Sequence, residues 1–164
     1  MMLPNESGVE STRVLDLDQS GLGKAYNQLI EEVPIVNGEK VLTLYRGTWE
    51  ATRGIIKRNR DGHLYMVLGV VENEDDQLNG WSASGNLTFI YSRLTDLPIP
   101  DASLDRVVGV YSADFFKFKE EIVKEVCRVL KPGGVFNILY FDQKDEVNGY
   151  YFEIKKENYI MNHE

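Results

Sequence analysis

Few residues in this sequence have the types and spacing that chemistry requires, and nucleotide or calcium binding is the first possibility to weigh. Residues 20–25, SGLGKA, resemble a phosphate-binding loop, but the pattern GxxxxGK[ST] would need glycine at Asp18 and a hydroxyl residue at Ala25. The acidic runs lack the ligand spacing of an EF-hand and its glutamate at the twelfth place. These runs are residues 16–18, 72–76 and 142–146. The sequence predicts neither a phosphate loop nor a calcium site.

Metal or nucleophilic catalysis would need histidine or cysteine in a recognisable set. The chain has two histidines, His63 and His163, and one cysteine, Cys127. Their spacing matches no zinc-ligand pattern, and the sequence has no G-x-S-x-G nucleophile elbow. We therefore expect no catalytic metal, and we expect Cys127 to be a small core residue.

The elements that would position a site alternate between strands and helices. Helical spacing predicts a helix over residues 22–33, a second to about residue 59 with Thr48 as its cap, and a third over 116–130 with Phe118, Ile122 and Val126 facing inward. Apolar runs predict strands over residues 41–45, 64–71, 86–92, 106–111, 135–141 and 149–156. This alternation predicts a three-layer, doubly wound α/β domain with a mostly parallel sheet.

Two linked motifs over about forty residues carry a family resemblance. Residues 97–105, LPIPDASLD, precede the predicted fourth strand, and residues 128–134, RVLKPGG, precede the fifth. This pair resembles the class I S-adenosylmethionine-dependent methyltransferase superfamily, in particular its small-molecule methyltransferases. The resemblance implies a Rossmann-like fold. Asp105 and the Pro-Gly-Gly turn belong to the framework of such a sheet and need not touch a ligand.

The same resemblance assigns the loop after the first strand to the cofactor, but the match there fails residue by residue. Residues 39–52, EKVLTLYRGTWEAT, have the shape of a strand ending in an acid followed by Gly-x-Gly-x-Gly. Thr43 stands at the acidic position, Tyr45 at the first glycine and Trp49 at the third, while Gly47 survives as the second. In such enzymes the glycines let the backbone approach the methionine portion of the cofactor, so two large aromatic residues would fill the pocket.

Other cofactor positions of the family are also replaced. Val71 stands at the position of the acid that holds the ribose, with Glu72 one step later. Arg93 stands at the position of the acid that contacts the adenine amino group, and a guanidinium cannot accept a hydrogen bond. Asp114 is the single weak candidate for a general base on the substrate side. If S-adenosylmethionine binds, Gly47 and Glu72 are the residues expected to hold it.

These losses favour a noncatalytic methyltransferase-like protein that acts as a binding or regulatory subunit, with no cofactor, over an ordinary enzyme. The partner would be another protein, such as an active methyltransferase, or a second copy. The alternative is a divergent S-adenosylmethionine-dependent methyltransferase acting on a small molecule or protein. A third resemblance is to the degenerate methyltransferase-like part of the anamorsin family. The absence of that family's cysteine-rich tail from this sequence argues against it.

The edge of the sheet and the aromatic residues bear on partner binding. The resemblance implies seven strands, whereas this chain has room for about six, so we expect a fold trimmed at its carboxyl end with an unpaired edge strand. Aromatic residues gather after the fourth strand and near the carboxyl end, either as core or as an interface. They are Tyr111, Phe115, Phe116, Phe118, Tyr150, Tyr151, Phe152 and Tyr159.

Composition sets the remaining limits. The 164 residues, 43% of them hydrophobic, are enough for one domain over residues 1–164, with residues 1–20 expected to be poorly ordered. A net charge of −8 disfavours nucleic acid, and no apolar run is long enough to cross a membrane. A single cysteine and the absence of a signal-peptide pattern indicate a cytoplasmic or nuclear protein.

Overall fold

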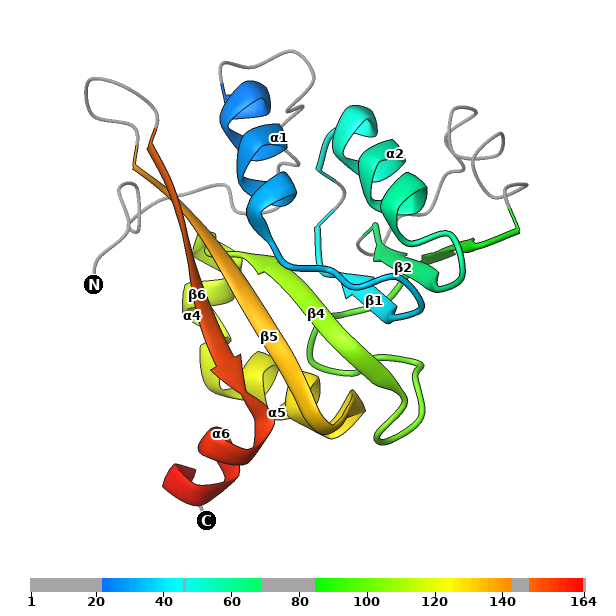
Figure 1. Cartoon of the computed structure of the whole chain (residues 1–164). Coiled ribbons are helices and arrows are strands. Elements are labelled where there is room, and N and C mark those ends of the chain that lie inside the picture. Colours follow the sequence, from blue (N-terminus) through cyan, green and yellow to red (C-terminus); the bar gives the residue numbers. More distant parts are fainter. Residues whose placement is uncertain (1–21, 46, 69–84, 143–147, 164) are drawn as a thin grey trace.

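The structure, a computed structural model, describes residues 22–45, 47–68, 85–142 and 148–163, and a six-stranded sheet forms its centre (Figure 1). The strand order is β3-β2-β1-β4-β5-β6, in which the first five strands run parallel and β6 runs antiparallel to β5. The strands are β1 (Lys40–Thr43), β2 (His63–Val67), β3 (Leu87–Ile90), β4 (Leu104–Val110), β5 (Leu130–Asp142) and β6 (Asn148–Lys155). The doubly wound, mostly parallel sheet predicted from the sequence is confirmed.

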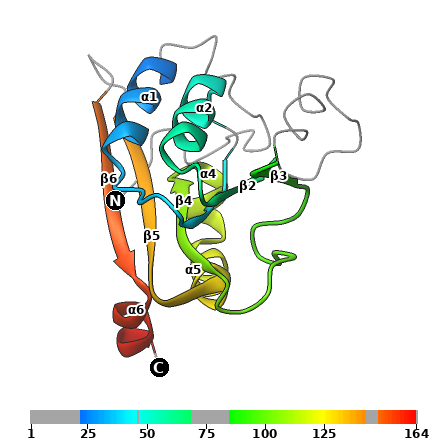
Figure 2. The same ribbon diagram turned by 45° about the vertical axis from the view of Figure 1, so that its right-hand side comes forward.

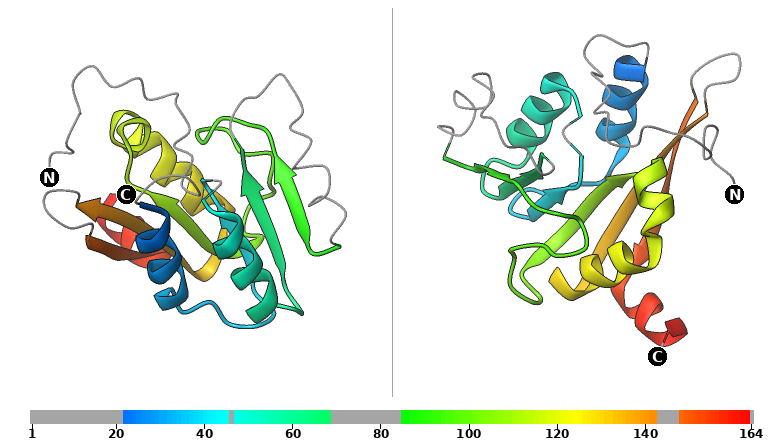
Figure 3. Two further views of the ribbon diagram at one scale, coloured as in Figure 1. Left: turned by 90° about the horizontal axis from the view of Figure 1, so that it is seen from above. Right: turned by 180° about the vertical axis from the view of Figure 1, so that it is seen from behind.

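Helices cover both faces of the sheet, as a three-layer fold requires. Helices α1 (Leu22–Glu32) and α2 (Trp49–Arg58) lie on one face, and α4 (Ala113–Lys117) and α5 (Lys119–Val129) lie on the other (Figure 3). Helix α6 (Lys156–His163) follows β6. Each face has its own apolar core, and neighbouring residues of β1 alternate between them: Val41 packs on the α1 side and Leu42 on the α5 side.

The predicted helix over residues 116–130 is in fact two helices. Ser112 starts α4 early, because its hydroxyl accepts a hydrogen bond from the Phe115 amide at 3.2 Å and its carbonyl accepts one from the Phe116 amide at 2.9 Å. The chain then breaks helical geometry at Phe118 (φ −115°, ψ 26°) before α5 begins. Phe118 is therefore 42% exposed, and its predicted inward position was wrong, whereas Ile122 and Val126 are buried as expected.

Asp105 binds two parts of the framework together. Its carboxylate accepts a hydrogen bond from the Lys40 amide at 2.8 Å, at the start of β1, and pairs with the Lys131 ammonium at 3.2 Å, in the Lys-Pro-Gly-Gly turn at the start of β5. Gly133 in that turn has φ +83°, a left-handed conformation that favours glycine. These contacts agree with the expectation that Asp105 and this turn belong to the framework of the sheet.

Arg128 joins the two motifs that carried the family resemblance. From α5 it pairs with Asp101 at 2.6 Å and with Glu125 at 2.7 Å, and it donates to the Leu97 carbonyl at 3.0 Å. The Leu97 amide in turn donates to Glu125 at 2.5 Å. This arrangement, the Arg128 clamp, holds the loop of residues 97–101 against α5, just before β4 begins at Leu104.

Candidate functional site

The carboxyl end of β1 and the start of α2 form the loop to which the resemblance assigns the cofactor. Thr43, the last residue of β1, is 2% exposed, and its hydroxyl donates to the Tyr65 carbonyl of β2 at 3.5 Å. A neutral side chain that bonds within the sheet thus occupies the position where an acid would point at a ligand.

Gly47 is the glycine of this loop that survives, and Tyr26 of α1 lies directly against it. Gly47 has φ +67°, and a Cβ atom there would lie 2.5 Å from the Tyr26 hydroxyl oxygen and 2.6 Å from its Cζ. Tyr26 is 3% exposed, and its burial, with a smaller effect of Tyr45, raises the pKa of its hydroxyl well above the usual range. The neutral tyrosine therefore fills the space that the absence of a side chain at Gly47 leaves open.

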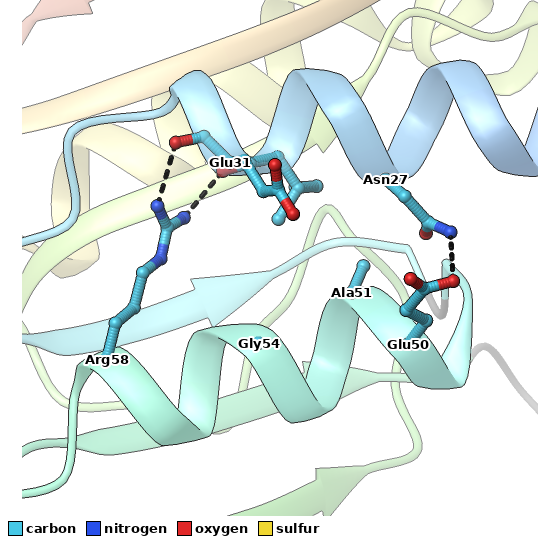
Figure 4. Close-up of a pocket in the computed structure, with 7 residues that line it drawn as sticks. Asn27, Glu31, Glu50, Ala51, Gly54 and Arg58 are labelled. Atoms are coloured by element: carbon cyan, nitrogen blue, oxygen red, sulfur yellow. Dashed lines mark hydrogen bonds between the residues drawn. The ribbon is translucent and has the colours of Figure 1, made fainter.

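The first turn of α2 is tied to α1 by a chain of hydrogen bonds. Thr48 is the N-cap predicted from the sequence, because its hydroxyl oxygen accepts the Ala51 amide at 3.0 Å. The same hydroxyl donates to the Asn27 Oδ1, and the Asn27 Nδ2 donates to Glu50 at 2.8 Å (Figure 4). These contacts hold α1 over the loop, so Tyr26 is fixed beside Gly47.

Among the remaining sequence candidates, two belong to this loop, and the others lie elsewhere or outside the described residues. Tyr45 and Trp49 are half-buried and pack against the core on the α1 side. Arg93 is exposed, between β3 and β4. Asp114 lies in α4, and its side chain is outside the described part, as are Val71 and Glu72. The structure thus brings Thr43, Tyr45, Gly47 and Trp49 together.

Sequence reasoning missed Tyr26 and Asn27 as residues of this site. Tyr26 was part of the apolar face that predicted the first helix, and this pattern says only that the face is buried. Nothing in the sequence indicates that its ring would meet Gly47, twenty-one positions away, because that contact depends on how α1 packs beside α2.

A hollow of about 190 Å³ lies between α1 and α2 (Figure 4). Its polar groups are already engaged with one another: Arg58 donates to the Ile30 carbonyl at 2.5 Å and the Glu31 carbonyl at 3.0 Å, and Asn27 bonds Glu50. Burial lowers the pKa of the Arg58 guanidinium from its usual value. Arg58 caps the carboxyl end of α1, and we assign this hollow to helix packing.

Histidine and cysteine have structural surroundings in the described part of the chain. The His63 Nε2 lies 2.7 Å from the Thr88 hydroxyl oxygen, and burial followed by the nearby Lys40 lowers the pKa of the imidazole. Cys127 is 6% exposed in the α5-side core, and burial raises the pKa of its thiol. Among the described residues, no three His, Cys, Asp or Glu side chains are grouped to hold a metal ion, and no helix could cross a membrane.

The aromatic residues are divided between core and surface. Phe115 is buried and contacts Tyr111 at a ring distance of 5.3 Å, and Tyr111 also lies 6.0 Å from Tyr140. At the surface, Tyr150 is 52% exposed and Phe152 is 44% exposed, both on β6. The exposed members of the group lie on β6 and around α4.

Comparison with known proteins finds similarity to methyltransferases. A family model described as a methyltransferase domain matches residues 64–138. The ubiquinone/menaquinone biosynthesis C-methyltransferase UbiE of Pseudomonas aeruginosa is 27% identical over 133 residues, covering 78% of this chain and 52% of the relative. UbiE of Pseudomonas fluorescens is 28% identical over 139 residues with the same coverage. The chain spans about half the length of the curated relatives it matches.

Solved structures show the same fold. A S-adenosylmethionine-dependent methyltransferase from Aquifex aeolicus superposes with a TM-score of 0.62 at 17% identity, covering 84% of this chain and 77% of the other. A chain from the complex between the Haloferax volcanii Trm112 methyltransferase activator and a methyltransferase gives 0.60 at 22% identity, covering 73% and 54%. These comparisons support the resemblance to the class I S-adenosylmethionine-dependent methyltransferases that the two motifs indicated, and the solved structures show the same fold.

Proposed function

We propose that this chain is a noncatalytic methyltransferase-like subunit that acts through protein contacts and binds no cofactor. The observation that carries the proposal is the close packing of Tyr26 on Gly47, in the loop that the resemblance assigns to the methionine portion of S-adenosylmethionine. The residues present therefore fit that cofactor poorly.

The polar groups of the loop support the same proposal. Thr43 carries a hydroxyl where family members carry a carboxylate, and this hydroxyl donates to the Tyr65 carbonyl within the sheet. The Ala51 amide at the start of α2 already donates to Thr48, which removes one of the donors that a helix N-terminus offers to an anion. Outside the loop, Arg93 stands at the position of the acid that contacts the adenine amino group, and its guanidinium only donates hydrogen bonds.

A divergent methyltransferase is the second candidate, and the similarity to the UbiE relatives over 78% of this chain favours it. In that case S-adenosylmethionine would be held by Gly47 and Glu72, and its substrate would be a small molecule or a protein.

Calorimetric titration with S-adenosylmethionine and S-adenosylhomocysteine distinguishes the two candidates. We expect no heat of binding for either compound up to millimolar concentration, with adenosine as the negative control. A dissociation constant in the micromolar range would refute the noncatalytic proposal. The variant Tyr26→Leu, which empties the space beside Gly47, shows in the same titration whether that ring is the obstacle.

The partner is proposed to be a protein. The structural similarity to a chain from the Trm112 complex of Haloferax volcanii supports this class of partner, and an active methyltransferase or a second copy is compatible with it. We propose a cytoplasmic or nuclear location, with no membrane or nucleic-acid partner; imaging of the tagged chain in its source cells tests the location.

A further inference from the structure

Strand β6 is the outer strand at one edge of the sheet, and its two faces differ (Figure 2). Ile154 packs against the core on the α5 side and Tyr151 against the core on the α1 side. Because side chains alternate along a strand, Tyr150 and Phe152 lie on the same face as Ile154. Within the described part of the chain, no strand lies beyond β6.

The α5-side face of β6 is apolar and only partly covered. Phe152 is opposite Ile138 in the β5–β6 register, and Ile138 is 6% exposed whereas Phe152 is 44% exposed. Tyr150, opposite the half-buried Tyr140, is 52% exposed. The cover that buries β5 therefore stops short of β6, where two adjacent aromatic side chains of one face meet solvent beside an open strand edge.

We propose that β6 pairs antiparallel with β6 of a second copy, with the two Tyr151 residues opposite each other on the twofold axis. This inference rests on the proposed binding function and names its partner. In this register Tyr150 faces Phe152 of the other copy on both sides of the axis, and cross-strand aromatic pairs of this kind stabilise antiparallel strands. The two sheets then continue across the dimer, and the open edge disappears.

Charge disfavours two neighbouring registers that also keep each face together. A register centred on Glu153 would place two carboxylates directly opposite each other, and one centred on Phe152 would place them on a diagonal. With Tyr151 at the centre, Glu153 lies opposite Gly149 and far from the other carboxylate. The pairing also spans residues 148–154 and stops before α6, which begins at Lys156.

The net charge makes the salt dependence informative. Each copy carries a formal charge of −8, so two copies repel, and added salt screens that repulsion. We therefore expect the dimer to become tighter as ionic strength rises. Association driven by opposite charges would show the reverse.

Sedimentation velocity over a concentration series is the first test. We expect a transition from 18.8 kDa to twice that mass, and Phe152→Lys should weaken the dimer by more than about tenfold. Tyr91→Lys is the matched control, because Tyr91 is also 44% exposed but follows β3 at the opposite edge of the sheet. A mass of 18.8 kDa throughout, or a dimer that Phe152→Lys leaves intact, overturns the proposal.

Cysteine cross-linking tests the register. In a Cys127→Ser background, Tyr151→Cys should form a disulfide-linked dimer under mild oxidation, because the two Cα atoms would be about 5 Å apart, within disulfide range. Glu153→Cys should not, since its Cα atoms would be separated by about 13 Å along the strands. Cross-linking at 153 and not at 151 overturns the proposed register.

The two proposals fail separately. A monomer that binds no S-adenosylmethionine refutes the second copy as partner and leaves the noncatalytic function standing. A dimer that binds S-adenosylmethionine refutes the noncatalytic function and leaves the second copy standing as the partner. Circular dichroism of each variant, including the Cys127→Ser background in the buried core, shows whether the fold is retained.

Discussion

The contact between Gly47 and Tyr26 predicts a large and specific cost for Gly47→Ala. The left-handed backbone at φ +67° costs alanine about 1 kcal/mol relative to glycine. The new Cβ would also lie 2.5 to 2.7 Å from the hydroxyl and ring of Tyr26, and overpacking of a buried site costs about 1–3 kcal/mol. We expect a total loss of about 2–4 kcal/mol, or a Tm lower by about 4–16 °C for a domain of this size.

A double-mutant cycle separates the two contributions. Tyr26→Leu removes the atoms that would collide, so in that background Gly47→Ala should cost only the backbone contribution of about 1 kcal/mol. Gly133→Ala is the matched control for backbone strain, because Gly133 has φ +83° and no atom within 4 Å of its Cβ position. Urea denaturation of the four proteins of the cycle measures the coupling. If the two changes add within about 0.5 kcal/mol, Tyr26 does not occupy the space beside Gly47, and the main support for a closed cofactor site is lost.

Three further predictions concern the framework. The hydrogen bond from Arg128 lowers the pKa of Glu125. The stability that this carboxylate contributes is therefore present above its ordinary pKa of 4.5 and is lost as the pH falls below that value. Urea denaturation as a function of pH should show a weaker acid dependence for Glu125→Gln. Thr48→Ala removes the N-cap of α2 and should lower the free energy of unfolding by about 1 kcal/mol in the same assay, whereas Thr48→Ser should restore most of it. Asp105→Ala should cost about 1–2 kcal/mol through the Lys40 amide that loses its acceptor, and an unchanged midpoint of thermal unfolding would contradict its framework role.

The fold could be predicted from the sequence because most of its elements follow from local pattern. Continuous apolar runs gave the parallel strands, and Thr48 marked the start of α2. The break at Phe118 was missed because apolar spacing continues through it, and the early start of α4 was missed because Ser112 lies outside the periodic segment.

The candidate site was predictable only in part. The sequence indicated that Thr43, Tyr45 and Trp49 replace the usual residues, since that comparison is made position by position. It did not indicate what takes the place of a ligand. Tyr26 reaches Gly47 through the packing of one helix on another, and such contacts between distant segments leave no local signature in the chain.

The Arg128 clamp has a consequence for how such chains are classified. The two motifs that carry the family resemblance lie between Leu97 and Gly134, and their residues bind one another. A protein that binds no cofactor would need these interactions just as much. These motifs therefore indicate that a chain adopts the fold, and they are expected in catalytic and noncatalytic relatives alike. Deciding between them requires looking at the loop after β1, which lies outside the residues 64–138 that the family model matches.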